Sequence, residues 1–426
     1  MKALYRGYIS VLQLLVIRGA GLLSLFFVNV VIARNFGPTV QGLFQIGLAI
    51  VIVVATVARL GQDQLMLRVA AEGKAVGDVK STNNRLAASL TLGSIFLTLS
   101  TVVAIAAIYV GPIKNFGNQS QAFLAIMTLA ILPTGILLIV TEATRGWQKI
   151  NLSIAWQGSI PQSLFLILVI TLIFAVNGNS LWIPVVYVFA FAISAIFACV
   201  AWMRVIGFRL QLPSWANLKY TFSQGTNFWL YSVVTSAVVW VDVFILSYLA
   251  TPEAVGNYTA IVRTGAAFGT IVQIGSLGAV SHLALLYAQN EYDKFGQYFR
   301  QCFYFIAIGS IPFASTALVF SAQIMSIWGS NYADLSTQFF VYLVFQSLNL
   351  SINIFVIVMA IIGLERTLLA LQLFHLAFKA IFTYLAFLSF GLPGAVWVSG
   401  ISLTLFNIAS AMALLRFLKS KNIKFL

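Results

Sequence analysis

The charged residues inside apolar stretches that are long enough to span a lipid bilayer include Arg18, Arg59, Asp242, Arg263 and Lys379. A charge at the centre of a membrane helix costs about 2.5–3.5 kcal/mol on insertion scales, so such residues usually face a bundle interior or a water-filled cavity. Four cations with one acid predict a cavity of net positive charge. Such a cavity would bind anions, because Arg offers a phosphate a two-pronged hydrogen-bonding fork and Lys offers a point charge.

A purely structural role is the alternative for part of this set. Asp242 and Arg263 are both expected near the outer ends of consecutive helices, where they could form an ion pair. Arg59 is expected near the inner end of its helix, whereas Arg18 and Lys379 fall nearer the middle of theirs. A pair between Asp242 and Arg263 would leave the other three cations without an acid partner, so the positive excess is expected under both interpretations.

Polar residues recur at helical spacing on four of the same predicted helices. The groups are Asn29 with Arg18; Gln45 and Thr56 with Arg59; Gln346, Asn349 and Asn353 with one another; and Gln372 and His375 with Lys379. Residues three, four or eleven positions apart share one face of a helix. Such stripes either hold helices together or line a hydrated lumen able to hydrogen-bond sugars. Asp242 and His375 are the candidates for proton or sodium coupling.

No pattern points to catalysis or to a bound cofactor. The sequence contains no Walker-type phosphate loop, no cluster with metal-ligand spacing and no pair of acids at useful spacing. The predicted outer loops are short, whereas an enzyme that transfers sugars outside the cell would be expected to present a larger one. We therefore expect no cofactor, no metal site and no enzymatic activity.

The elements that must position these residues are membrane helices. Of 426 residues, 61% are hydrophobic and 8% charged, and the mean hydropathy is +0.97. A membrane-spanning helix needs about 20 predominantly apolar residues, and twelve such segments predict an all-α, multi-pass membrane protein. The expected spans are 9–33, 42–60, 86–110, 122–141, 152–176, 181–203, 228–250, 259–287, 301–327, 339–362, 367–390 and 395–418.

The positive charges predict the orientation, because Lys and Arg accumulate in cytoplasmic loops. With the N-terminus inside, only Arg34 and Lys114 fall on the outer side, and the remaining cations outside the helices fall on the inner side. Both termini are therefore expected in the cytoplasm. The net charge of +14 is mostly a topology signal, and no basic patch on a soluble module indicates a nucleic-acid partner.

A short internal repeat predicts two lobes. "VQGLFQIG" from Val40 and "AVGNYTAI" from Ala254 align Gly42 with Gly256 and Phe44 with Tyr258, half a chain apart. Six helices separate the two copies, so both have the same orientation, which fits a pseudo-two-fold repeat. We expect an N-terminal lobe over 1–203, a cytoplasmic inter-lobe linker over 204–226 and a C-terminal lobe over 227–426.

Four motifs along the chain resemble the Wzx-type polysaccharide flippases of the multidrug/oligosaccharidyl-lipid/polysaccharide (MOP) exporter superfamily. They are "ARNFGPTVQGLFQIG" from Ala33, "RGWQKIN" from Arg145, "VDVFILSYLATPEAVGNYTA" from Val241 and "FGLPGAVWVSGIS" from Phe390. They are built from glycine, aromatic and apolar positions and therefore indicate the superfamily better than they indicate a substrate. The resemblance implies a V-shaped, MATE-like transporter of two six-helix lobes.

The resemblance also implies a cargo. It would be an undecaprenyl-pyrophosphate-linked oligosaccharide, such as an O-antigen unit for lipopolysaccharide, flipped across the bacterial inner membrane by alternating access. Arg18, Lys379, Arg59 and Arg263 would bind the pyrophosphate, and the polar stripes would contact the glycan. A polysaccharide polymerase and chain-length machinery would be partners, beside membrane lipids and a proton or sodium counter-ion.

Two other functions fit parts of the pattern. A drug/cation antiporter of the same architecture would need acids in its lumen, and the sequence offers mainly Asp242. A membrane enzyme acting on polyprenyl phosphates would need paired acids to hold a metal–pyrophosphate complex, and no such pair is visible.

Overall fold

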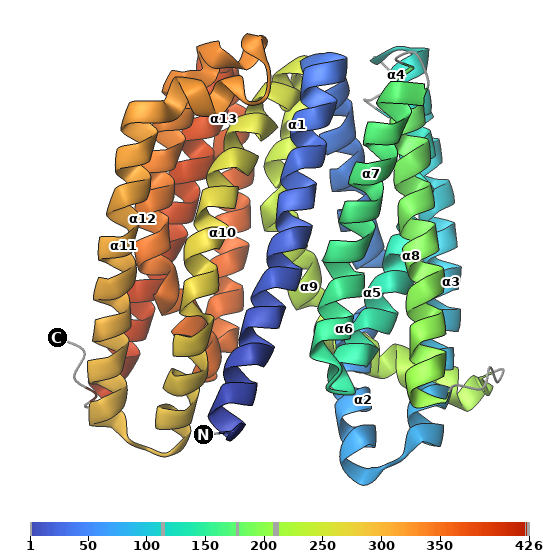
Figure 1. Ribbon diagram of the computed structural model, residues 1–426, viewed down its shortest axis with the longest axis vertical. Helices are drawn as coiled ribbons and strands as arrows, with labels where there is room; N and C mark the ends of the chain where they lie inside the picture. Colours follow the sequence, from blue (N-terminus) through green and yellow to red (C-terminus); the bar gives the residue numbers. More distant parts are fainter. Residues whose placement is uncertain (1, 112–115, 176–178, 208–212, 422, 424–426) are drawn as a thin grey trace. The chain divides into compact units, whose positions relative to one another are not determined.

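The computed structural model describes residues 2–111, 116–175, 179–207, 213–421 and 423 (Figure 1). These residues form helices and short connections, and no strand occurs among them. The all-α prediction is confirmed. Some of the counted loop cations, such as Lys114 and Arg209, lie outside the described residues.

The first and last helices are each broken once at a glycine. α1 (Lys2–Ala58) is interrupted at Gly37, whose φ is +80°, and α13 (Glu365–Ser420) at Gly391, whose φ is +62°. Glycine adopts positive φ without a steric penalty, and the prolines that follow, Pro38 and Pro393, lack the N–H that would continue the helix. Each of these helices therefore contains two of the twelve predicted spans, joined by a kink instead of a loop.

Most of the other helices lie along the remaining predicted spans, and two of them, 62–76 and 330–335, lie between predicted spans. In the first half the other helices are α2 (Gln62–Val76), α3 (Val79–Val110), α4 (Asn118–Thr128), α5 (Ile131–Gly146), α6 (Ile150–Ile154), the π-helix η2 (Ala155–Ser159), α7 (Ile160–Ala175) and α8 (Trp182–Ile206). In the second half they are α9 (Trp215–Leu249), α10 (Pro252–Ala288), α11 (Tyr292–Ser326), the 3-10 helix η3 (Ser330–Leu335) and α12 (Ser336–Ile361). The fourth span is divided between α4 and α5, and the fifth contains the π-helix.

By length and composition, eight helical segments of the described residues are apolar enough to cross a membrane. Two of them, Val16–Ala58 and Glu365–Ser420, each contain two predicted spans on either side of the kink. The predicted spans over 259–287 and 301–327 lie in α10 and α11, which fall outside this set of eight. The chain is a multi-pass membrane protein.

The chain divides into two compact units. Unit 1 contains Met1–Trp240 and Ala250–Gly256, and unit 2 contains Val241–Leu249 and Asn257–Leu426. The division falls within α9, which begins at Trp215, inside the segment predicted as a linker. The predicted lobe boundaries stay a prediction.

Each unit has its own packing order. In unit 1, α5 packs against α2, α3 and α8, while α1 packs against α7 and η2. In unit 2, α12 packs against both α11 and α13. The core of unit 2 includes a cluster of Phe295, Phe299, Phe355 and Leu414, which joins α11, α12 and the end of α13.

Candidate functional site

A buried ion pair lies in unit 2. The Lys379 Nζ on α13 is 2.8 Å from the Asp242 Oδ2 on α9, and the two residues are 7% and 2% exposed. The Tyr258 hydroxyl on α10 donates a hydrogen bond to the same carboxylate oxygen, and the Val243 N–H donates to Oδ1 over 2.9 Å. Burying two charges costs free energy unless they are paired and hydrogen-bonded, and here the carboxylate has a cation and two donors.

Arg263 on α10 is a second cation of this cluster. It interacts electrostatically with Asp242 and with Tyr258 and Tyr342. Asp242 forms an ion pair with Lys379 and also interacts electrostatically with Arg263, so the expected structural pair between Asp242 and Arg263 stays a prediction. Asp242 can neutralise one of the two cations, so these three residues keep one net positive charge.

Polar side chains of α12 and α13 form further hydrogen bonds in unit 2, and two of them, Tyr342 and His375, interact electrostatically with Asp242. The Gln346 Nε2 donates to the Tyr342 hydroxyl over 2.6 Å, and the His375 Nε2 lies 3.3 Å from the Ser402 Oγ. The Asn407 Nδ2 donates to the Asn349 Oδ1 over 3.1 Å. Of the predicted residues, Gln346, Asn349 and His375 are buried, whereas Asn353 and Gln372 are half-buried.

Four residues that form these contacts are not among those predicted from sequence: Tyr258, Tyr342, Ser402 and Asn407. Tyr258 stands in the Gly-x-aromatic repeat, but an aromatic residue there reads equally well as a packing residue. The others are single polar positions on apolar helices, where only tertiary contacts reveal the partner.

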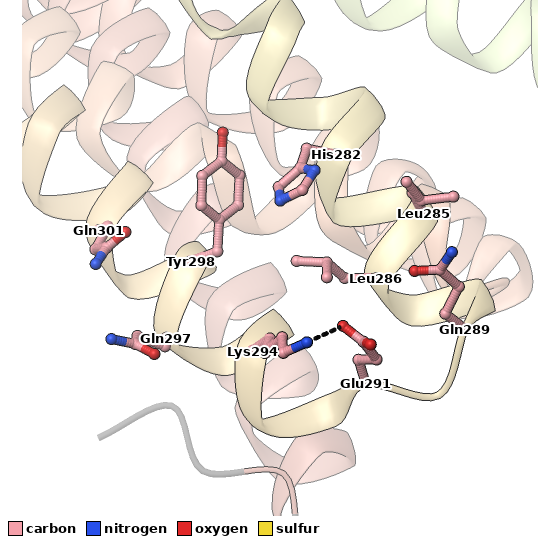
Figure 2. A pocket seen from close by; sticks show the side chains of 9 residues that line it. All are labelled: His282, Leu285, Leu286, Gln289, Glu291, Lys294, Gln297, Tyr298 and Gln301. Carbon is pink, nitrogen blue, oxygen red and sulfur yellow. Dashed lines mark ion pairs between the residues drawn. The ribbon is translucent and has the colours of Figure 1, made fainter.

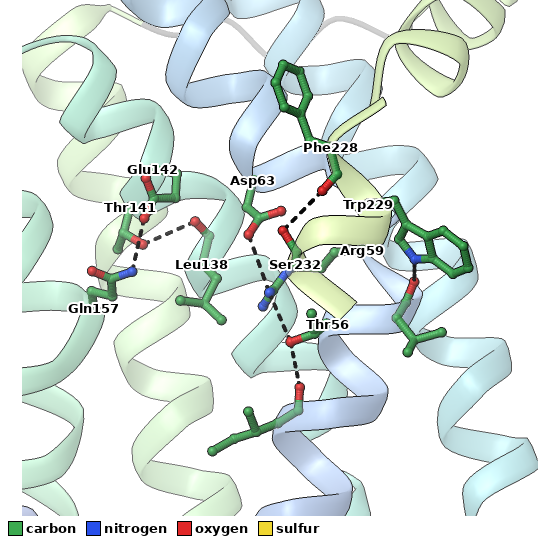
Figure 3. A network of polar contacts seen from close by, with 12 residues as sticks. Thr56, Arg59, Asp63, Leu138, Thr141, Glu142, Gln157, Phe228, Trp229 and Ser232 are labelled. Atoms are coloured by element: carbon green, nitrogen blue, oxygen red, sulfur yellow. Dashed lines mark hydrogen bonds and ion pairs between the residues drawn. The ribbon is translucent and has the colours of Figure 1, made fainter. Parts of the chain in front are cut away.

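A second buried ion pair lies in unit 1 (Figure 3). The Arg59 Nη2 is 3.4 Å from the Asp63 Oδ2 and donates to the Thr56 Oγ1 over 3.3 Å. Arg59 is 5% exposed and Asp63 7%. The Arg59 Nε and Nη1 have no hydrogen-bond partner within the described part of the chain. This guanidinium is therefore buried with two of its three nitrogens unsatisfied.

A third buried acid, Glu142 of α5, lies nearby (Figure 3). It is 4% exposed and pairs with Arg145 at 2.6 Å, while the Gln157 Nε2 of η2 donates to its Oε1 over 3.0 Å. Glu142 also interacts electrostatically with Asp63 and Arg59. These contacts join α1, α2, α5 and η2 in one polar network at the ends of the predicted spans.

These acids correct the count of charges inside the helices. One acid was expected inside the helices and Arg59 was expected without a partner, whereas Asp63 pairs with Arg59 and Glu142 is also buried. Hydropathy ended the predicted spans at 60 and 141, but α2 begins at Gln62 and α5 continues to Gly146. Asp63 therefore lies in the first turn of α2, just across the tight turn from Arg59 and within ion-pair distance.

Asn29 and Gln45, predicted to face a polar lumen, are hydrogen-bonded to each other inside unit 1. The Asn29 Oδ1 accepts from the Gln45 Nε2 and from the Gln41 Nε2, the latter over 2.8 Å. All three side chains are buried, and the bonds cross the kink of α1. The Oε1 atoms of both glutamines have no partner among the described residues.

Arg18 differs from the other three cations. It is exposed on α1 and makes no hydrogen bond or ion pair with any residue that the structure describes. The adjoining face of α1 packs on η2 and α7: the Ser159 hydroxyl donates to the Ile17 carbonyl, and the Ser24 and Ser163 hydroxyls are 2.8 Å apart. Packing therefore fixes this helix while the guanidinium projects from it.

A pocket of about 420 Å³ opens in unit 2 where α10 turns into α11 (Figure 2). Its walls carry His282, Gln289, Glu291, Lys294, Gln297, Tyr298 and Gln301, with Leu285 and Leu286. The His282 and Tyr298 rings meet edge to face with centroids 4.6 Å apart, and Lys294 pairs with Glu291 at 3.0 Å. None of the predicted site residues lines it.

Comparison with solved structures identifies the fold. An inward-facing MATE-family multidrug resistance transporter of the MOP superfamily aligns with a TM-score of 0.76 at 14% identity, covering 96% of this chain and 98% of that one. A MOP transporter from Pyrococcus furiosus, described as having a binding pocket of reverse polarity, aligns with a TM-score of 0.64 at 15% identity, covering 96% and 95%. A MATE transporter in its straight conformation aligns with a TM-score of 0.64 at 14% identity, covering 96% of both chains.

Sequence comparisons identify the family. No curated protein matches the chain. A family model described as "Polysaccharide biosynthesis protein" matches residues 9–280, which is more than half of the sequence. The chain therefore belongs to the polysaccharide biosynthesis protein family, and it has the fold of the MATE transporters of the MOP superfamily.

Proposed function

We propose that this protein is a flippase for an undecaprenyl-pyrophosphate-linked oligosaccharide, an O-antigen unit or a similar repeat. It moves the glycan from the cytoplasmic to the periplasmic leaflet of the bacterial inner membrane by alternating access, with both termini in the cytoplasm. The family match supports a role in polysaccharide biosynthesis, and the fold supports transport over catalysis.

The observation that carries the proposal is the state of Arg18. It lies in the apolar segment Val16–Ala58 and is exposed without a hydrogen-bond or ion-pair partner among the described residues. An unpaired cation at this depth is costly and marks a functional site. A pyrophosphate is a fitting partner, because its oxygens accept the paired N–H groups of a guanidinium.

Lys379 of unit 2 is a second cation that we propose for pyrophosphate binding. Lys379 is paired with Asp242, so neutralising that carboxylate would leave the full charge of Lys379 for a phosphate oxygen. A proton or sodium ion at Asp242 would release Lys379, which is how we propose that an ion gradient is coupled to transport. His375 lies within electrostatic reach of both residues and belongs to the same proposed coupling site.

The glycan contacts are proposed for the half-buried amides of unit 2. Asn353 and Gln372 are partly accessible, whereas Gln346 and Asn349 donate or accept within the network already described. Asn29 and Gln45 already use their hydrogen-bonding groups on each other, so a glycan would have to replace that bond.

The test is native mass spectrometry of the protein purified gently from its own host. We expect an undecaprenyl-pyrophosphate oligosaccharide to copurify with the natural protein and to be lost from Arg18→Ala. Arg68→Ala is the matched control, since this exposed arginine of α2 is paired with Glu72 on the surface. Retention of the lipid-linked glycan by Arg18→Ala would overturn the assignment of Arg18.

A drug/cation antiporter is the second candidate, and the buried acids favour it. Asp63 and Glu142 add carboxylates to Asp242, although each is paired with an arginine. This function predicts that organic cations raise the melting temperature of the purified protein and that only ordinary phospholipids copurify. The flippase proposal predicts that organic cations do not raise the melting temperature and that a lipid-linked oligosaccharide copurifies.

A further inference from the structure

A small polar pocket in unit 1 has no role in the proposed transport. It encloses about 290 Å³ where the turn between α2 and α3 meets the beginning of α9. Its lining residues are Asp78, Lys80, Ser81, Asn84, Arg85 and Asn217. All of them are charged or polar, so the pocket is suited to a charged group and not to a hydrocarbon chain.

Most of the hydrogen-bond donors in this pocket are unused. The side chains of Lys80, Asn84, Arg85 and Asn217 form no hydrogen bond or ion pair with any other residue in the described part of the chain. The acid of the pocket is engaged, because the Asp78 Oδ1 accepts the Ser81 N–H over 2.9 Å as the N-cap of α3. Two cations and one acid give the pocket one net positive charge.

An aromatic ring holds Arg85 in place. The Arg85 Cζ lies 4.9 Å from the centroid of the Tyr220 ring on α9, a cation–π contact. This contact does not use the hydrogen-bonding capacity of the guanidinium, so its N–H groups stay available to an acceptor. A guanidinium fork beside an ammonium group and two carboxamides is a set of donors that matches the oxygens of a phosphate.

The position of the pocket indicates that the phosphate belongs to a lipid. It lies at the beginning of α3, just before the apolar run that starts at Leu86, which is where a membrane-spanning helix would meet lipid head groups. Further along α3, Ile95, Leu99 and Val102 are 57–60% exposed and offer an apolar path to an acyl chain. Basic pockets at the ends of membrane helices are a known way to bind anionic head groups.

We propose that this pocket binds the phosphate group of an anionic phospholipid. The proposal does not depend on the transported substrate, since none of the pocket residues belongs to the transport site proposed above. A bound lipid would tie the α2–α3 turn to the beginning of α9 by bridging Lys80 and Arg85 on one side and Asn217 on the other.

The experiment is a native mass spectrometry titration of the full-length protein in detergent with phosphatidylglycerol. The test variant is the double change Lys80→Gln and Arg85→Gln. The control is Arg68→Gln with Lys149→Gln, which removes the same charge from exposed positions of unit 1. Each cation near an anionic lipid contributes about fivefold in affinity, so the test variant should bind roughly 25-fold more weakly and the control should bind nearly as the natural protein.

Three results would overturn the proposal. Equal weakening in the control would mean that the basic surface attracts lipid without a specific pocket. Unchanged binding in the test variant, with its melting temperature preserved, would place the lipid elsewhere. Displacement of the lipid by millimolar inorganic phosphate would show that the pocket serves a soluble phosphate. Arg85→Lys, which keeps the charge and loses the fork, should bind with intermediate affinity, and the melting temperature of the double variant shows whether weakened binding is merely misfolding.

Discussion

Gly42 of α1 and Gly256 of α10 pack backbone against backbone. A Cβ atom at Gly42 would lie 1.7 Å from the Pro252 carbonyl oxygen and 2.9 Å from the Gly256 nitrogen, and a Cβ at Gly256 would lie 2.1 Å from the Pro38 carbonyl oxygen. These are the two glycines that the internal sequence repeat aligns. The repeat therefore marks a place where corresponding positions of the two half-sequences meet, and only the absence of a side chain permits the contact.

Gly42→Ala should destabilise the protein, because the atoms that the new methyl group would meet belong to backbone and cannot swing away. We expect a loss of at least about 1–3 kcal/mol, the usual cost of overpacking, seen as a lower melting temperature. Gly19→Ala is the control on the same helix, since a Cβ there meets no heavy atom within 4 Å. Equal melting temperatures for the two variants would contradict the close packing.

The helices could be predicted from sequence because the length of an apolar run is a local property. The ion pairs could not be predicted from sequence in the same way. Lys379 and Asp242 are far apart in the chain, and only the packing of α9 against α13 brings them to 2.8 Å. Sequence spacing suggested Arg263 as the partner of Asp242 because those two lie on consecutive helices.

The ion pair of Asp63 was missed for a different reason. Asp63 is four residues from Arg59, so the pair could have been predicted from sequence, but the hydropathy boundary at 60 assigned the acid to a loop.

The hydrogen bonds among Asn29, Gln41 and Gln45 could not be predicted for another reason. Their hydrogen bonds cross the kink at Gly37, and a helical wheel drawn for each span separately cannot show contacts between the two halves of α1.

Asp63→Asn should destabilise unit 1 strongly. The change leaves Arg59 buried with no carboxylate, and two of its nitrogens already lack acceptors. Breaking a buried pair on one side costs about 3–5 kcal/mol, whereas Glu72→Gln, which breaks the exposed pair with Arg68, should cost about 0–1 kcal/mol. Thermal unfolding of the two variants measures the difference. If Asp63→Asn melts like Glu72→Gln, water or another group solvates Arg59.

Asp242→Asn and Lys379→Met should each lower the melting temperature more than the two changes lower it together. Either single change leaves one charge buried without its counter-ion, whereas the double change removes both. In a double-mutant cycle on melting temperature, the coupling should favour the pair by about 1–3 kcal/mol. Additive effects would mean that Arg263 compensates for the loss of Lys379 at Asp242.

Arg18→Lys separates the charge of Arg18 from its shape. If Arg18 binds a pyrophosphate through its guanidinium fork, the ammonium of Lys keeps the attraction but loses one of the two parallel hydrogen bonds. Flipping should fall about tenfold, which corresponds to roughly 1.4 kcal/mol of binding, while Arg18→Ala should abolish it. The assay is the appearance of labelled lipid-linked oligosaccharide in the outer leaflet of proteoliposomes. Equal activity of the Lys variant and the natural protein would show that Arg18 acts as a charge alone, and full activity of the Ala variant would remove it from the transport site.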